Sequence, residues 1–312
     1  MKNTQTDVRV DHHDDHDHPG FAADMERARI LNRRRALGFL GLASTSALVV
    51  ACGGGSSGSS SSTSSSGGTA TATATPTPTS TTTATPTPTA TATSSSCTAY
   101  ATETNGPYPA DGTNTSSGST SNVLTISSFQ RSDIRSSIGT GNTAAGTQMT
   151  FTITLVDVNN SCAALAGYAI YLWHCNAEGD YSLYDLPNEN YLRGIQTTDA
   201  NGQVTFTTIV PGTYSGRYPH IHFEVFSSLT NATTGRSARL ISQFSLPKDT
   251  LATLYAANST YSGSISALNS TTLDSDNVFG DNTTAQKTAM MITMSGSASA
   301  GYTASAVVGI AT

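Results

Sequence analysis

The sequence is poor in charged residues. Asp, Glu, Lys and Arg make up 12% of its 312 residues, and the formal net charge is −6. A nucleic-acid-binding domain normally carries a basic stripe or patch. After residue 96 acidic side chains outnumber basic ones, which argues against a surface of that kind. We therefore expect no nucleic acid among the partners of this protein.

Long hydrophobic runs are also missing. The longest candidate, from Ala36 to Ala51, is shorter than the about 20 apolar residues that a membrane-spanning helix needs. It follows three arginines, Arg33 to Arg35, so it fits the apolar region of a signal peptide and resembles a twin-arginine signal. Val49 to Cys52 resembles a lipobox in which Cys52 is lipidated; the alternative is a plain signal peptide with an incidental cysteine. We expect residues 1–52 to be a signal segment that exports the protein as a cell-surface or periplasmic lipoprotein, meeting the membrane only through its lipid anchor.

Residues 53–96 lack charge altogether and contain almost nothing that a core could bury. The segment is rich in Gly and Ser and then in Thr-Pro repeats, a composition typical of a disordered linker. The remaining residues, 97–312, are numerous enough for one domain with its own core. The predicted order is therefore signal segment, linker and a single domain.

Cysteine is scarce, with four in the chain. With Cys52 assigned to lipid, three remain: Cys97, Cys162 and Cys175. An exported protein meets an oxidising environment in which disulfides form. The expected pair is Cys162 with Cys175, at the two ends of a short turn-and-strand segment, and Cys97 remains a competing partner for either.

Several segments alternate apolar and polar residues, the pattern of a half-buried strand, and turn residues separate them. The expected strands cover 148–158, 167–175, 202–210, 220–226 and 238–244, with one or two closing strands within 287–310. Rough helical spacing occurs at 246–257. Short strands at this spacing favour an all-β fold, an antiparallel β-sandwich with long loops and little helix.

Histidine is rare, and after residue 96 only His174, His220 and His222 occur. Side chains two apart on a strand point to the same face. His220 and His222 in RYPHIHFEVF (217–226) therefore form half of a possible metal site. The types of the remaining ligands identify the metal, and His174, Glu224 and Asp199 are candidates for them.

Tyrosine supplies a different pair of candidates. Tyr181 and Tyr214 each follow a glycine-containing turn. A free phenol has a pKa of about 10, so only a strongly charged metal ion would hold it ionised near neutral pH. Ferric iron is such an ion. Two phenolates and two imidazoles would leave it one net positive charge, which suits an anionic bidentate ligand such as a catecholate.

Three segments carry a family resemblance: NAEGDYS (176–182), TDANGQVTFTTIVPGTY (198–214) and RYPHIHFEV (217–225). They are similar to the core motifs of the intradiol ring-cleavage dioxygenases, the family of protocatechuate 3,4-dioxygenase and catechol 1,2-dioxygenase; GPYP (106–109) and LISQF (240–244) fit too. The resemblance implies a non-haem iron(III) enzyme on a β-sandwich, which uses O2 to open a catechol ring between its two hydroxylated carbons. The form PGxYxGRxxHIH resembles a compact exported branch.

The resemblance also implies roles for individual residues. The iron ligands would be Tyr181, Tyr214, His220 and His222. Tyr181 would be the ligand that leaves when substrate binds, and it would take a substrate proton. Arg217 would lie beside the substrate ring and stabilise its carbanion character, with Gln243 nearby. Pro107 and Tyr108 would line the substrate pocket.

One alternative belongs to another functional class. The domain could be a non-catalytic exported β-sandwich binding module with a vestigial or different metal site. Within the enzyme hypothesis the substrate candidates are catechol, protocatechuate, hydroxyquinol or a larger plant-derived catechol. Nothing in the sequence determines the oligomeric state.

Overall fold

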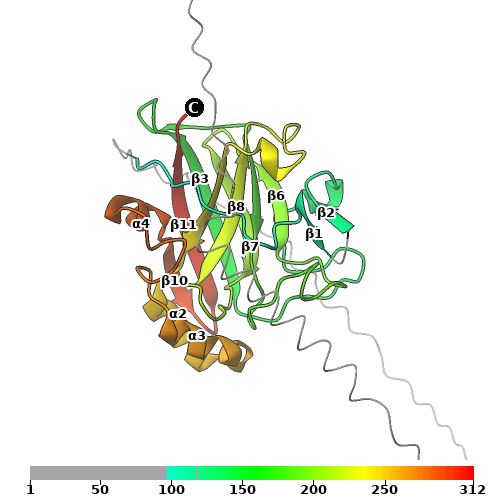
Figure 1. The fold of residues 1–312 in the computed structure, drawn as a ribbon, viewed down its shortest axis with the longest axis vertical. Coiled ribbons are helices and arrows are strands. Elements are labelled where there is room, and N and C mark those ends of the chain that lie inside the picture. Colours follow the sequence, from blue (N-terminus) through cyan, green and yellow to red (C-terminus); the bar gives the residue numbers. More distant parts are fainter. Residues whose placement is uncertain (1–96, 117–118) are drawn as a thin grey trace, which may run out of the picture. The chain divides into compact units, whose positions relative to one another are not determined.

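The computed structural model describes residues 97–116 and 119–312 (Figure 1). The expected signal segment, its Cys52 and the expected linker at 53–96 lie outside the described residues. In the part that is described, no helix combines the length and the apolar character needed to cross a membrane.

The domain consists mostly of strands, as predicted (Figure 1). One sheet has the path β10 (Thr293–Ser297), β11 (Gly301–Ile310), β3 (Gln148–Asp157) and β4 (Ala163–Ala164), with β7 (Gln203–Ile209) also paired to β3. A second sheet has the order β6 (Arg193–Thr197), β5 (Ala169–Trp173), β8 (His220–Phe226) and β9 (Leu240–Ser245). A small hairpin joins β1 (Asp111–Ser116) to β2 (Ser119–Asn122). All neighbouring strands are antiparallel except β11 and β3, which run parallel.

Helix is confined to short segments. The α-helices are α2 (Lys248–Ala257), α3 (Ile265–Ser270) and α4 (Thr284–Met290), and the 3-10 turns are η2 (Ser127–Phe129), η3 (Gly235–Ser237) and η4 (Ser259–Ser264). The helical spacing at 246–257 is confirmed by α2. The beginning of the region expected to hold closing strands is instead α4, which a Thr283–Gln286 capping box initiates. The closing strands β10 and β11 follow it.

The two larger sheets pack face to face through aromatic side chains. Phe151 of β3 lies edge-on to Phe244 of β9, with ring centroids 5.0 Å apart. Phe244 in turn stacks on Phe223 of β8 at 4.2 Å. These contacts belong to one cluster of buried residues that includes side chains of both sheets, which is the core of a β-sandwich.

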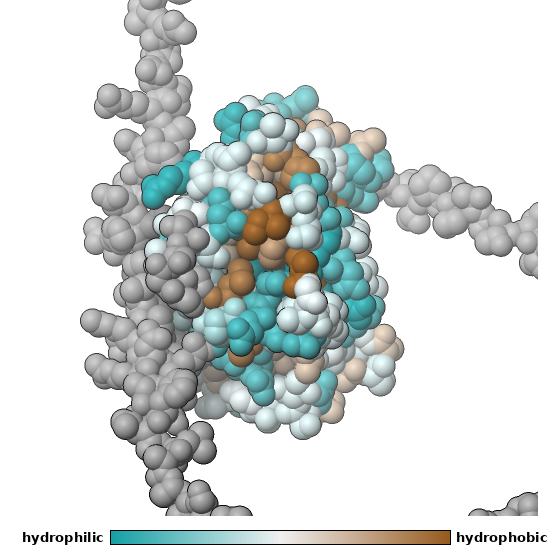
Figure 2. Space-filling model, turned by 90° about the vertical axis from the view of Figure 1, so that its right-hand side faces the viewer, coloured by the Kyte–Doolittle hydropathy of each residue, from teal (hydrophilic) through white to brown (hydrophobic). Residues whose placement is uncertain are grey.

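The outer face of the β6-β5-β8-β9 sheet is also covered. A second buried cluster packs there, and it includes Tyr108, Val123, Phe129 and Ala232 from the connecting segments. Every residue of β8 is therefore buried on both faces. The surface on the side of the β1–β2 hairpin is largely hydrophilic, with hydrophobic areas lying between polar ones (Figure 2). The outer face of this sheet can thus hold a site shielded from water.

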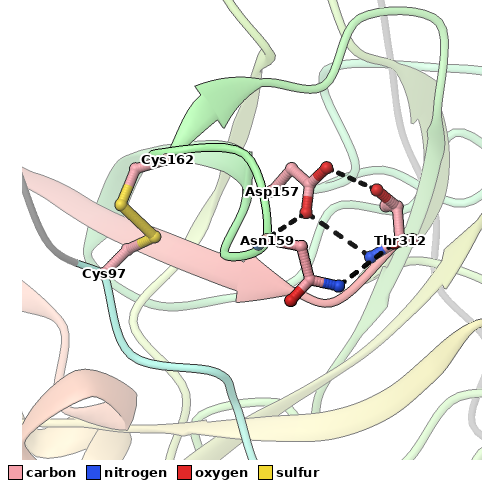
Figure 3. Close-up of a disulfide and its surroundings, with 5 residues drawn as sticks. All are labelled: Cys97, Asp157, Asn159, Cys162 and Thr312. Atoms are coloured by element: carbon pink, nitrogen blue, oxygen red, sulfur yellow. Dashed lines mark hydrogen bonds between the residues drawn. A yellow bond between two sulfur atoms is a disulfide. The ribbon is translucent and has the colours of Figure 1, made fainter.

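The disulfide differs from the expected one. Cys97 is bonded to Cys162, with their Cα atoms 5.9 Å apart (Figure 3). The predicted Cys162–Cys175 pair is wrong. Cys162 lies in the β3–β4 turn, and the segment after Cys97 runs beside β11, where the Tyr100 amide donates to the Gly309 carbonyl at 3.0 Å. Cys175 forms no disulfide with any described residue; its thiol is buried in the cluster on the outer face of the other sheet and donates to the Gly212 carbonyl at 3.5 Å.

The C-terminus is fixed at the same turn (Figure 3). The Asn159 side-chain amide donates to the Thr312 carbonyl at 3.1 Å, and the Thr312 hydroxyl donates to Asp157. Both ends of the described domain are therefore held at the β3–β4 turn.

Candidate metal centre

Strand pairing places four side chains in one row across the outer face of the second sheet. Trp173 of β5 is paired with Arg193 of β6 on one side and with His222 of β8 on the other. His222 is paired with Gln243 of β9. Paired residues lie side by side on the same face. This row is the floor on which the site is built.

Four donor atoms converge above this row. The Nε2 atoms of His220 and His222 are 3.1 Å apart. The hydroxyl oxygens of Tyr181 and Tyr214 each lie 3.3 Å from Nε2 of His220 and 3.5 Å from each other. All four side chains are buried. The structure therefore brings together the four residues expected to be metal ligands.

Two interlocking turns deliver the tyrosines. The turn before Tyr181 contains Gly179 at φ +92°, and a Cβ there would lie 3.1 Å from the Thr213 carbonyl oxygen. The turn before Tyr214 contains Gly212, where a Cβ would collide with the carbonyl of Ala177. Glycine at both positions lets the two backbones approach closely. The two phenols consequently meet although their residues are far apart in sequence.

The tautomer of one histidine fits a cation. Nδ1 of His220 lies 2.7 Å from the Tyr218 carbonyl oxygen, which can only accept, so Nδ1 carries the proton and Nε2 presents its lone pair to the other donors. Burial lowers the pKa of His222 well below its ordinary value, and the neighbouring His220 and Arg217 add to this, so its imidazole is neutral. The two Nε2 atoms are at hydrogen-bond distance, 3.1 Å, and with both unprotonated the imidazoles would direct their lone pairs at one cation. The donor set, two imidazoles and two phenols, fits a hard, highly charged metal ion.

The phenols distinguish this centre from the usual metal clusters. Among the residues described, no group of three or more His, Cys, Asp and Glu side chains could hold a metal ion. Here only two such residues contribute, and tyrosines supply the other two donors. This donor set would suit a metal ion that stabilises a phenolate.

Arg217 is held beside the site by two partners. Its Nε donates to Asp276 at 3.0 Å, and both side chains are fully buried. Its Nη2 donates to Oε1 of Gln243 at 2.6 Å, and the Gln243 amide donates to the Thr104 carbonyl at 2.9 Å. Gln243 thus links Arg217 to the Thr104 carbonyl, and its proposed catalytic role stays a prediction.

Asp276 was not predicted from the sequence. Besides Arg217, it accepts the Tyr218 amide at 2.6 Å and the amides of Val278 and Phe279 at 2.8 and 3.0 Å. It comes from the irregular segment between α3 and α4, and no motif marks it. Only the folded chain brings this carboxylate under Arg217.

Tyr108 stacks on Tyr181, with ring centroids 4.7 Å apart. It therefore covers one side of the Tyr181 ring, and its role in lining a substrate pocket stays a prediction. Pro107 instead contributes through its backbone carbonyl, which accepts the Asn114 amide at 2.6 Å, and its ring is partly exposed.

Trp173 is another residue that sequence reasoning did not assign to the site. Its ring lies parallel to the His222 imidazole, with 4.9 Å between centroids and 6° between planes. The stack fixes the orientation of the imidazole. Finding it in advance would have required the β5–β8 register.

The other candidate ligands have different roles. His174 donates from Nδ1 to the Cys175 carbonyl at 2.8 Å and accepts the Thr208 hydroxyl at 2.7 Å, which occupies both ring nitrogens. Asp199 is an exposed turn residue that accepts two backbone amides. Glu224 is fully buried one row away, where burial and the nearby Asp111 carboxyl raise its pKa well above the ordinary value.

Comparisons with known proteins agree with this fold. A family model for dioxygenases matches residues 127–283, half of the chain. The structure of an intradiol ring-cleavage dioxygenase from Tetranychus urticae is similar at a TM-score of 0.51 and 23% identity, covering 69% of this chain and 95% of that one. A second dioxygenase structure gives 0.50 and 22% over the same shares. No curated protein sequence matches. The chain belongs to the intradiol ring-cleavage dioxygenase family.

Proposed function

We propose that this protein is an iron(III) dioxygenase that opens a catechol-type ring between its two hydroxylated carbons. The observation that carries the proposal is the convergence of the Tyr181 and Tyr214 oxygens with Nε2 of His220 and His222, at separations of 3.1 to 3.5 Å. These four residues would hold the iron. Both atoms of O2 end in the product, a cis,cis-muconate-type diacid, so no external reductant is required.

When bound, iron(III) supplies a Lewis acid that polarises the chelated substrate and makes its ring reactive towards O2. The protein side chains do the rest. Tyr181 would take a proton from a substrate hydroxyl. Arg217 places a fixed positive charge where negative charge develops on the ring. Asp276 and Gln243 keep that guanidinium in position.

The surroundings of the site exclude water. Tyr181 and Trp173 are fully buried, and Tyr108 covers Tyr181. A dry site strengthens the interaction between Arg217 and the anionic ring, because the local dielectric constant is low. It also protects the reactive substrate from side reactions.

The proposed location is outside the cytoplasm. Tethered through Cys52 and the segment at 53–96, the enzyme would meet catechols in the surroundings of the cell. A twin-arginine route exports folded proteins, so iron could be inserted before competing metals are met. Cys52→Ser should release the protein from membranes into the soluble fraction; full retention would contradict the lipid anchor.

The test begins with colour. Two iron-bound phenolates give a visible charge-transfer band, so purified iron-loaded protein should be reddish and should consume O2 with at least one member of a catechol panel. Colourless protein with a full iron complement would contradict the ligand assignment. Coloured protein that consumes no O2 with any catechol would favour a non-catalytic binding module.

A further inference from the structure

Arg193 is a second arginine in the row that carries His222, and the reaction outlined above does not use it. It lies on β6 and is fully buried. Over the part of the chain that is described, it forms no ion pair, in contrast to Arg217 with its partner Asp276. A buried guanidinium without a carboxylate is costly unless its N–H groups are satisfied by other acceptors.

The hydrogen bonds of Arg193 offset this desolvation cost. Nε donates to the Ser182 hydroxyl at 3.0 Å, and Nη2 donates to the Ser182 carbonyl at 2.9 Å. Nη1 donates to the Pro109 carbonyl at 3.1 Å and to the Tyr171 hydroxyl at 3.2 Å. The Tyr171 hydroxyl itself donates to the Pro109 carbonyl at 2.8 Å. The planar fork of arginine suits acceptors in several directions.

The two segments held in this way each carry a ring of the site. Pro109 follows Tyr108, and Ser182 follows Tyr181. The rings of Tyr108 and Tyr181 stack on each other. One guanidinium on the sheet therefore fixes the backbone next to both rings.

A second bridge joins the same segments. The Tyr184 hydroxyl accepts the Ala110 amide at 2.8 Å and donates to the Asn114 side chain at 2.7 Å. The Tyr184 ring lies 5.4 Å from the Arg193 guanidinium, within the range of a cation–π contact. Arg193 thus also steadies the residue that makes the second bridge.

We propose that Arg193 is a positioning residue for the ring-cleavage site: it locks the Pro109 and Ser182 segments onto the sheet and so sets the placement of Tyr108 against Tyr181. The inference rests on the proposed function for its catalytic consequence. It rests on the hydrogen bonds alone for its structural consequence. A positive charge alone could not replace Arg193, because its four hydrogen bonds need the several N–H groups of a planar guanidinium.

The test is Arg193→Lys, which keeps the charge and loses the fork. Arg135→Lys is the control, because Arg135 also uses its fork, donating from Nε and Nη2 to Asp133 and from Nη1 to Gln148, and none of these bonds reaches Arg193 or a ring-bearing segment. In Arg193→Lys we expect kcat/KM to fall about 10- to 100-fold, the range for residues that support metal ligands. KM should rise and the visible band should shift, because both Tyr108 and the proposed ligand Tyr181 are displaced. The control should keep the wild-type band and KM.

A structural readout separates this inference from the proposed function. Amide hydrogen exchange of folded Arg193→Lys should rise together at Ala110 and Leu183, and not in β3. If wild-type protein shows no visible band, the proposed function fails. The exchange experiment still tests whether Arg193 holds the Pro109 and Ser182 segments on the sheet. The inference would be overturned if Arg193→Lys kept the wild-type visible band, kinetics and exchange rates, or if Arg135→Lys lost them to the same extent.

Discussion

The two faces of the β6-β5-β8-β9 sheet are equally buried and chemically opposite. The inward side chains of β8 are Ile221, Phe223 and Val225. Its outward side chains include His220 and His222. The inner face is held by apolar contact, which tolerates small shifts. On the outer face each polar atom needs its own partner, so small shifts matter.

This difference separates stability from activity within a single strand. Changes on the inner face should reduce the free energy of unfolding and leave the chemistry of the folded molecules intact. Changes on the outer face should alter the chemistry first. Variants of the two faces should therefore differ in which property they lose, activity or stability.

Removing one of the two phenol oxygens should cause the largest loss of activity among variants of the outer face. Tyr214→Phe keeps the ring and removes the oxygen that lies 3.3 Å from Nε2 of His220. We expect loss of the visible band and at least a 100-fold loss of activity, beyond the roughly 10- to 100-fold typical of residues that only support ligands. Tyr168→Phe, a partly buried tyrosine packed against the core, is the control. An unchanged band in Tyr214→Phe would refute its assignment as a ligand.

Removing an aromatic ring from the inner face should lower stability and leave activity unchanged. Phe223 is fully buried and stacks on Phe244. Phe223→Ala should cost about 4 kcal/mol of unfolding free energy, because it leaves a cavity in the core. Denaturant unfolding measures the loss. Activity per folded, iron-loaded molecule should stay near wild type; a loss as large as in Tyr214→Phe would show that the two faces are not independent.

Asp276→Asn sharpens the comparison, because it leaves a buried charge on the outer side without its partner. Arg217 would lose its ion pair, and breaking a buried pair costs about 3 kcal/mol. We expect lower stability together with lower kcat, since the Arg217 guanidinium would no longer be held beside the substrate ring. Asp274→Asn, at an exposed ion pair with Lys287, is the control and should change neither by a measurable amount. A stable and fully active Asp276→Asn would exclude the positioning role.

The smallest effect concerns a histidine outside the candidate metal centre. Burial lowers the pKa of His174 from 6.5 to about 4, with a smaller contribution from Arg193 in the same direction, against the Cys175 carbonyl, which raises it. The folded state thus favours the neutral ring. Its stabilising contribution is complete above pH 6.5 and is lost as the pH falls towards 4.

Between pH 7 and pH 5 this loss should amount to about 2 kcal/mol of unfolding free energy. His174→Asn should remove that part of the pH dependence while the rest of the profile persists. Unfolding curves at both pH values measure it. Identical pH profiles for the wild type and the variant would contradict the assignment.

Much of the candidate site could be predicted from local patterns. Alternation identifies β3, β7 and β8, and it places His220 and His222 on one face, because successive strand residues point to opposite sides. The glycine turns mark Tyr181 and Tyr214. These features depend on residues close in sequence. Sequence resemblance then joined them into one family motif.

The disulfide shows where local reasoning ends. Cys162 and Cys175 are close along the chain, yet Cys97, 65 residues away, is the partner of Cys162. Which strand edges meet depends on the packing of both sheets. The number of residues between two cysteines gives no measure of the distance between them in the folded chain.

The sequence alone determined the strand periodicity, the all-β class and the order of the four candidate ligands, since each depends on neighbouring residues. Tertiary structure alone decided that Asp276 supports Arg217, that Trp173 stacks on His222 and that Arg193 joins two distant segments. These contacts join residues from separate elements, and they exist only once the strands have paired in one register and the loops have closed over the sheet.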